Sequence, residues 1–370
     1  MNKNKDKNKK KKGKLISSLI SLLTAVIALI IVLIPVFTGV VMYFNAPVHE
    51  SKRASVFSQN DAIKLADDGS YLIDIRKGES SQSVGMRLER TGLISNRYFW
   101  NIICRLDKNY IKTGTYRINM PASQIAIYRT LVSGQEVLHK VTIPEGVTLK
   151  KMARIIEESG ISSAQDFLDA AKNPAILSRF NIPNQTMEGY LFPDTYLFPG
   201  EYPAEKIITA MADNFFGNLK KINPSVLTMS PKELNEKVIL ASIVEREYRV
   251  EKEAPVMAGV FYNRLRINMA LQSCATVEYI ITEIQNRPHP SVLLFKDIEI
   301  DDPYNTYVYP GLPPGPISAP GLTSLKAVFS PENTNYLYFR LEDVASGKHY
   351  FSRTHDEHIK AGQLITKPWH

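Results

Sequence analysis

One long apolar segment constrains this 370-residue chain more than any other feature. No formally charged residue occurs from Leu15 to His49, and Leu15–Phe44 is almost entirely apolar. A helix needs about 20 residues to cross the hydrocarbon layer of a bilayer, and the apolar part of a cleaved signal peptide has only about 7–15. Residues 15–44 are therefore predicted to form a retained transmembrane helix rather than a signal peptide.

Charge is distributed unevenly around this segment. Residues 1–14 contain eight Lys and one Asp, so residues 15–370 keep 37 basic and 36 acidic residues. Because positive charge beside a span stays in the cytoplasm, the basic tail 1–14 predicts a single-pass protein with a cytoplasmic N-terminus and an exported remainder. That remainder lacks the basic surface of nucleic-acid-binding proteins, so nucleic acid is not an expected partner.

The exported part is expected to begin with a polar linker, residues 45–70, followed by an internal repeat. A shift of 68 positions aligns residues 73–99 with residues 141–167. In each copy, alternating apolar residues predict a strand, a Gly predicts a turn, and apolar residues four apart predict a helix that ends at a second Gly. The region 71–185 resembles a duplicated LysM carbohydrate-binding module, although a duplicated packing unit without a ligand would have the same pattern.

The segment 186–370 is predicted to be an α+β catalytic domain. It begins with an extended segment rich in proline and aromatic residues at 187–203, and a similar loop occupies 301–320. Apolar periodicity and capping residues predict helices at 204–219, 230–248, 252–268 and 322–329, and a hairpin of 336–340 with 348–353.

Glu245 is the candidate catalytic residue. It follows residues 238–244, which are apolar on nearly all faces and predict a buried helix. Partial desolvation raises the pKa of a carboxyl group, and a general acid needs a raised pKa to hold its proton near neutral pH. Glu247 lies about 200° further around the helix and is not expected to share this face. An ion pair between Glu245 and a nearby Arg is the alternative.

Aromatic and amide residues toward the C-terminus predict a sugar-binding surface. Nine Tyr or Phe residues occur within 301–351. Flat rings stack on the apolar faces of sugars, and amides bond hydroxyl and acetamido groups. The alternative role of these rings is packing within strands. The expected substrate-binding residues are Asn263, Gln272, Tyr304, Asn305 and Tyr307.

No metal site and no cofactor are expected. His355 and His358 have an i, i+3 spacing, but no third metal ligand is evident beside them. Cys104 and Cys274 are 170 residues apart and belong to no CxxC pair, so both are expected to be buried thiols. The sequence contains no P-loop, GxGxxG or GxSxG motif, so nucleotide binding and a hydrolase elbow have no support.

Seven motifs occur in order along the exported region: EGYLFPDTY (188–196), LASIVERE (240–247), AGVFYNRL (258–265), MALQSCATVEY (269–279), PYNTY (303–307), GLPPGPISAPG (311–321) and YLYF (336–339). The set closely resembles the endolytic murein transglycosylase family, the YceG-like proteins of bacteria. The resemblance implies an inner-membrane protein that cuts peptidoglycan glycan strands internally, with Glu245 as catalytic residue. It makes peptidoglycan synthases of the elongation machinery candidate partners. Cys274 and Ala275 replace an Asp-Pro pair that many members have.

Three functions are compatible with these features. A lytic transglycosylase would cleave the β-1,4 bond between N-acetylmuramic acid and N-acetylglucosamine and leave 1,6-anhydro-N-acetylmuramic acid ends. A peptidoglycan hydrolase would need a second carboxylate, for which Glu188, Asp194 and Asp302 are candidates. A non-catalytic wall-binding scaffold would use only the repeat and the anchor. The resemblance favours the transglycosylase.

Overall fold

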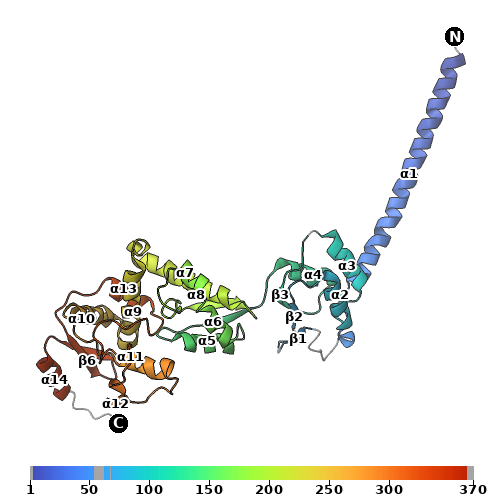
Figure 1. Cartoon of the computed structure of the whole chain (residues 1–370). Helices are drawn as coiled ribbons and strands as arrows, with labels where there is room; N and C mark the ends of the chain where they lie inside the picture. The colour runs from blue at the N-terminus through green and yellow to red at the C-terminus, as the bar shows by residue number, and fades with distance from the viewer. Residues whose placement is uncertain (1–2, 54–61, 67, 108, 365–370) are drawn as a thin grey trace. The chain divides into compact units, whose positions relative to one another are not determined.

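The computed structural model describes residues 3–53, 62–66, 68–107 and 109–364. Two compact units make up the chain, residues 1–137 and 138–370. Each unit combines helices with small antiparallel sheets, which agrees with the predicted mixture of helix and strand (Figure 1).

The first unit begins with the long helix α1 (Lys3–Asn45). Among the described residues, Ser18–Asn45 is the one helical stretch long and apolar enough to cross a membrane, with a mean hydropathy of 3.0. Its leucine, isoleucine and valine side chains are exposed to the surroundings instead of packing in a core. The predicted span 15–44 is thus helical over its whole length.

The end of α1 is hydrogen-bonded to the folded part of the first unit. The Phe44 carbonyl accepts hydrogen bonds from Gln124 Nε2 at 2.7 Å and from Ser95 Oγ at 3.1 Å. The Asn45 side-chain oxygen accepts one from the Ile125 N–H at 2.9 Å. The C-terminal end of α1 is therefore in direct contact with the folded part of the first unit at residues 44 and 45.

A three-stranded antiparallel sheet and three short helices complete the first unit. Their bounds are β1 (Ile63–Leu65), β2 (Tyr71–Ile75), α2 (Ser81–Arg90), α3 (Arg97–Leu106), β3 (Gly114–Ile118) and α4 (Gln124–Ser133). Ile73 on the central strand pairs with Ile63 on one side and Tyr116 on the other. Its side chain packs in a core with Leu88 and Trp100, all fully buried.

The predicted linker and repeat differ from the structure in their boundaries. Strand β1 lies inside the range 45–70 expected to be a linker, because its residues extend the sheet beside β2; residues 54–61 and 67 of that range lie outside the described residues. The unit boundary after Val137 falls inside the range 71–185. The two copies of the repeat therefore belong to different units.

The local structure of the two copies is the same. Each contains a strand, a turn, a helix and a second helix, in β2-α2-α3 and in β4 (Leu138–Thr142), α5 (Leu149–Glu158) and α6 (Ala164–Ala170). Gly92 and Gly160 both have φ +71° at the helix ends. The N–H after each glycine donates to a carbonyl five residues earlier, at 2.9 and 3.3 Å. This is the left-handed helix stop that the sequence predicts.

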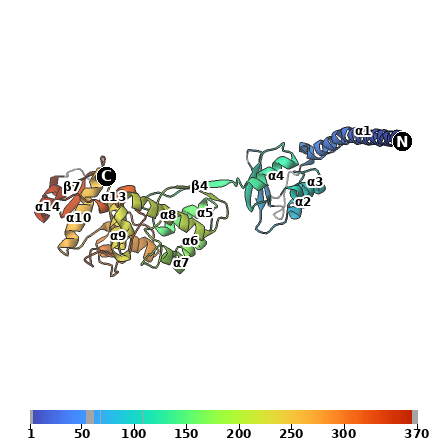
Figure 2. The same ribbon diagram turned by 90° about the horizontal axis from the view of Figure 1, so that it is seen from above.

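The second unit continues with further helices and two antiparallel strand pairs, the long-range pair β4-β5 and the hairpin β6-β7 (Figures 1 and 2). The remaining bounds are α7 (Pro174–Arg179), β5 (Thr195–Pro199), α8 (Ala204–Ile222), α9 (Pro231–Glu247), α10 (Ala254–Arg266), α11 (Cys274–Tyr279), α12 (Phe295–Ile298), α13 (Leu322–Phe329), β6 (Tyr338–Asp343), β7 (Lys348–Ser352) and α14 (His355–Leu364). The helices and the hairpin predicted in this region are confirmed within about three residues at their ends.

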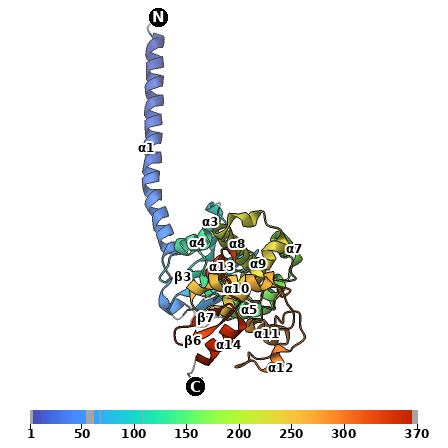
Figure 3. The ribbon, with the colours of Figure 1, turned by 90° about the vertical axis from the view of Figure 1, so that its left-hand side faces the viewer.

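Helix α9 packs in the core of the second unit, beside α10 and α13 (Figure 3). Ser230 caps its N-terminus by accepting a hydrogen bond from the Glu233 N–H at 3.2 Å, and Pro231 occupies the first helical position. Residues 238–244 are all buried, as their apolar sequence predicts, and the helix packs against α10, α11 and α13. The Ser242 hydroxyl accepts the Ile317 N–H at 3.0 Å, which holds the proline-rich loop on the helix.

Candidate active site

Glu245 and Glu247 follow the buried part of α9 and lie on different faces of the helix. The helix ends after Glu247 because Tyr248 adopts extended backbone angles, φ −72° and ψ 146°. Glu245 and Glu247 follow seven consecutive buried residues and are themselves half-buried. Because the two side chains lie about 200° apart on the helix, they meet different surroundings.

Glu245 contacts the N-terminus of α13. Its Oε2 accepts hydrogen bonds from the Gly321 N–H at 2.8 Å and from Ser324 Oγ at 2.7 Å, and its Oε1 accepts one from the Tyr248 hydroxyl at 3.4 Å. Burial raises the pKa of Glu245 to about 7, although the donors from Ser324 and Gly321 favour the charged form. The negative charge of Glu145 also raises it.

The Glu145 carboxyl group lies close to Gly321 and to Glu245. A Cβ atom at Gly321 would meet the carboxyl group of Glu145, an exposed side chain that would have to move aside. The Gly146 N–H donates to the Ala319 carbonyl and the Ala319 N–H donates to the Val147 carbonyl, both at 2.9 Å. These bonds join the turn of the second repeat copy to the proline-rich loop. The sequence analysis did not select Glu145, because no local pattern indicates this long-range pairing.

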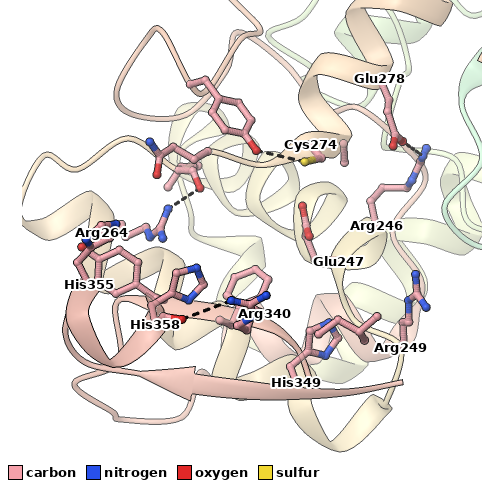
Figure 4. Close-up of a pocket in the computed structure, with 17 residues that line it drawn as sticks. Arg246, Glu247, Arg249, Arg264, Cys274, Glu278, Arg340, His349, His355 and His358 are labelled. Carbon is pink, nitrogen blue, oxygen red and sulfur yellow. Dashed lines mark hydrogen bonds and ion pairs between the residues drawn. The ribbon is translucent and has the colours of Figure 1, made fainter. Parts of the chain in front are cut away.

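A cavity of about 530 Å³ lies at another face of α9 (Figure 4). Glu247 lines it from α9, Gln272 lines it just before α11, and Cys274 and Glu278 line it from α11. Residues of β6, β7 and α14 complete the wall. Glu245 is not among the lining residues, so the structure does not bring the predicted catalytic residue into this cavity.

Glu247 is the carboxyl group with the chemistry of a proton donor in the cavity. Burial raises its pKa, and the negative charge of Glu278 raises it further. The Ser273 hydroxyl donates a hydrogen bond to Glu247 Oε1, and the positive charges of Arg246 and Arg264 oppose the increase. A desolvated carboxyl beside an open space can hold a proton and deliver it to a bound molecule.

Two of the five predicted substrate-binding residues line this cavity. Gln272 lies at its edge with φ +51°, and its N–H donates to the Thr306 carbonyl at 3.0 Å. Tyr307 lies opposite Cys274, with 3.1 Å between the hydroxyl oxygen and the sulfur. Tyr304 instead packs against Tyr279, with ring centroids 5.1 Å apart, and does not line the cavity.

The predicted amides Asn263 and Asn305 stabilise the backbone. Asn263 is buried, and its Nδ2 donates to the Thr334 and Tyr336 carbonyls at 2.8 and 2.9 Å. Asn305 is fully buried, and its Nδ2 donates to the carbonyls of residues 298 and 300 at 2.9 and 2.8 Å. Both amides hold loops in place, so neither is carried into the site proposed below.

The two cysteines lie in different surroundings. Cys104 is half-buried, and burial raises the pKa of its thiol to about 11. Cys274 is exposed where α11 begins, so the expectation that both thiols are buried is wrong for this residue. Its exposure follows from its position at the cavity wall, which the sequence pattern does not indicate.

None of the three carboxylates considered for a hydrolase lines the cavity. Glu188 is buried and accepts the Leu149 N–H at the start of α5, with both oxygens at 3.0 Å; burial raises its pKa to about 8. Asp194 accepts a hydrogen bond from Asn214, and Asp302 accepts the Tyr304 N–H at 2.9 Å. These carboxylates have structural partners in the fold.

Comparison with known proteins gives consistent matches. The model of the YceG-like family matches residues 73–363. An endolytic murein transglycosylase of Streptococcus pneumoniae serotype 2 is 30% identical over 320 residues, covering 77% of this chain and 56% of the relative. One of Bacillus subtilis is 32% identical over 315 residues, covering 78% and 83%. This chain therefore spans about half the length of the pneumococcal relative.

A solved structure is also similar. The crystal structure of a yceG-like protein of Listeria monocytogenes is 33% identical, covers 79% of this chain and 98% of its own, and has a TM-score of 0.52. The family match extends over both units, including both copies of the repeat and the cavity. The chain belongs to the YceG-like family.

Proposed function

We propose that this protein is a membrane-anchored endolytic transglycosylase that cleaves the β-1,4 bond between N-acetylmuramic acid and N-acetylglucosamine inside peptidoglycan strands. The named relatives support the substrate and the reaction class. The single observation that carries the chemical assignment is the position of Glu247, a desolvated carboxyl group that lines the 530 Å³ cavity.

The choice between Glu245 and Glu247 rests on their contacts. The carboxyl of Glu245 is held by the first turn of α13 and lies outside the cavity lining. Glu247 lines the same cavity as Gln272 and Tyr307, whose polar groups can orient a sugar. Glu247 is therefore our candidate for the acid, and Glu245 is assigned to support of the fold.

One carboxyl group is sufficient for this reaction. Glu247 donates its proton to the departing glycosidic oxygen while the bond from C1 of the muramyl ring to that oxygen breaks. The C6 hydroxyl of the same ring then attacks C1, and the Glu247 carboxylate takes the hydroxyl proton, which restores the acid. The new C6–O–C1 bond makes 1,6-anhydro-N-acetylmuramic acid. Attack from within the ring profits from proximity.

The test compares Glu247→Gln with Glu245→Gln on purified peptidoglycan. Loss of general acid catalysis lowers turnover by about 10²–10⁴-fold, so Glu247→Gln should lose turnover and keep glycan binding. Glu245→Gln should keep most of its turnover. Mass spectrometry should find anhydro-muramyl ends. The reverse ranking of the two variants would return the role to Glu245.

Hydrolysis is the second candidate, because another carboxylate lines the same cavity. Glu278 forms an ion pair with Arg246 at 2.8 Å, and its side chain is 24% exposed. A hydrolase could use such a group to activate water. Products that carry ¹⁸O from labelled water at the muramyl reducing end would identify hydrolysis.

The remaining assignments concern location and binding. The apolar helix within α1 and the eight lysines before it support a single-pass anchor in the inner membrane with a cytoplasmic N-terminus. The shared strand-and-helix order of the two repeat copies supports a LysM-like, glycan-binding role. Peptidoglycan synthases of the elongation machinery are proposed partners, because cleavage of nascent strands places the enzyme beside the machinery that makes them.

A further inference from the structure

The cavity beside Glu247 has an excess of positive charge. Four arginines face two glutamates in its lining, together with three histidines. In the view of Figure 4, Glu247 lies between Arg264, His355 and His358 on one side and Arg246 and Arg249 on the other. General acid catalysis by Glu247 does not require these cations, so their role is a separate question.

Two of the four arginines have structural partners. Arg246 forms the ion pair with Glu278. Arg264 donates from its guanidinium to the carbonyls of Leu271 at 2.8 Å and Leu337 at 2.6 Å. These two side chains have limited capacity to bind a further anion.

The other two arginines keep free donor groups. Arg249 is exposed two residues beyond the end of α9, and within the described part of the chain no hydrogen bond or ion pair is found for it. Arg340 Nε is buried and has no partner among the described residues, and its terminal nitrogen reaches only the His358 carbonyl at 3.4 Å. A buried donor without a partner costs free energy that a bound acceptor recovers.

Two histidines complete this part of the cavity. His358 Nδ1 is also buried without a partner in the described structure, and its ring stacks on Tyr338. His355 also contacts Tyr338, with ring centroids 5.7 Å apart. Burial and the positive charges of Arg340, His355 and Arg264 lower the pKa of His358, as expected where positive charge is not compensated.

We propose that Arg249, Arg340, His355 and His358 form a basic pocket that binds a carboxylate on the peptide carried by the muramyl residue of the glycan. The inference rests on the proposed function, because it takes the wall glycan as the substrate. Guanidinium groups match the planar oxygen pair of a carboxylate. A volume of about 530 Å³ is within the range of ligand pockets and leaves room for a substituent beside the sugar.

In this proposal the basic pocket binds the substrate, and Glu247 carries out the proton transfer. A muramyl residue whose peptide carboxylate is held by Arg249 and Arg340 is fixed beside Glu247, so the acid meets the glycosidic oxygen next to that residue. Strands without peptides lose this contact. The pocket thereby selects peptide-bearing strands over bare ones. This selection is expected to change the binding affinity for the strand more than the turnover rate.

Isothermal titration calorimetry of the full chain in detergent tests the inference. The probe is N-acetylglucosaminyl-N-acetylmuramyl tripeptide, compared with the same molecule after its carboxylates are converted to methylamides. The wild-type protein should bind the carboxylate form at least about tenfold more tightly, as expected for charge-assisted hydrogen bonds. Arg249→Gln and Arg340→Gln should bind both forms equally and weakly. Arg154→Gln is the matched control, because Arg154 is exposed on α5 outside the cavity.

Equal affinity of the wild-type protein for the two forms would overturn the inference, as would unchanged selectivity in Arg249→Gln, a variant at an exposed position that does not threaten folding. Inorganic phosphate that displaces the tripeptide at lower concentration than acetate would identify a phosphate-bearing ligand and reject the peptide carboxylate. The probe is bound and not cleaved. Selective binding by a protein without turnover would therefore refute only the proposed function, and turnover without selectivity would refute only the pocket.

Discussion

Replacing Glu245 by Gln tests whether this carboxyl supports α13 instead of catalysis. A Gln side-chain oxygen can accept the same hydrogen bonds from Gly321 and Ser324. In the folded protein burial raises the pKa of Glu245 to about 7 from its usual 4.5, so the folded state binds this proton more tightly than the unfolded chain. The stability that comes from the proton is complete below pH 4.5 and is lost as the pH rises through 7.

The size of the effect follows from the two pKa values. The interval from 4.5 to about 7 corresponds to roughly 3 kcal/mol, at about 1.4 kcal/mol for each pH unit. Gln does not titrate, so the variant avoids this loss. The variant should match the wild type near pH 4.5 and exceed its stability above pH 7 by an amount that approaches this value.

Urea unfolding of the second unit, followed between pH 4.5 and 8.5, measures this difference. Glu158→Gln is the matched control, because it makes the same substitution at an exposed position on α5. A Glu245→Gln protein that is less stable than wild type at pH 8 would refute the reasoning. Loss of turnover in that variant with unchanged stability would show that Glu245 takes part in the chemistry.

Three further predictions concern the fold and the location. Gly259→Ala, on α10, should lower stability by about 1–3 kcal/mol because its Cβ would lie 2.5 Å from the Glu332 carbonyl oxygen. Gly217→Ala, in an open position on α8, should stabilise by about 0.5–1 kcal/mol. Thermal unfolding compares the two variants, and equal effects would contradict the close approach at Gly259. Alkaline phosphatase fused after Tyr71 should be active, and an inactive fusion would reverse the assigned orientation. Residues 46–137 should sediment with peptidoglycan, and a fragment that stays in solution would leave the first repeat copy with a structural role only.

Local patterns predicted the local structure of this chain well. The apolar segment 15–44 is helical, the glycines at 92 and 160 end helices with positive φ, and residues 238–244 form a buried helix. Each of these features depends on a short stretch of sequence, in which periodicity and capping residues determine the backbone. The helix bounds in the second unit follow from the same signals.

Long-range contacts explain what the sequence did not predict. The apolar residues 238–244 led to the prediction that Glu245, the first carboxyl group after them, is catalytic. The cavity that Glu247 lines is completed by β6, β7 and α14, about 90–110 residues further along the chain. Asn305 carries an amide of the kind that binds sugars, yet this amide donates its hydrogen bonds to backbone carbonyls of its own loop. The basic pocket could not be predicted either, because the sequence does not indicate that Arg249 and Arg340 share a wall.

If α1 anchors the protein in the membrane and the first unit binds glycan, as proposed above, the hydrogen bonds of Phe44 and Asn45 would determine how the protein reaches the cell wall. A flexible tether would let the folded part of the first unit sweep a volume, whereas a helix bonded directly to Gln124 and Ile125 would keep that part at a constant height above the bilayer. A glycan bound to it would be met only in a thin layer next to the membrane. The search would then be two-dimensional, driven by lateral diffusion of the anchor, and it would sample newly made strands before they move outward.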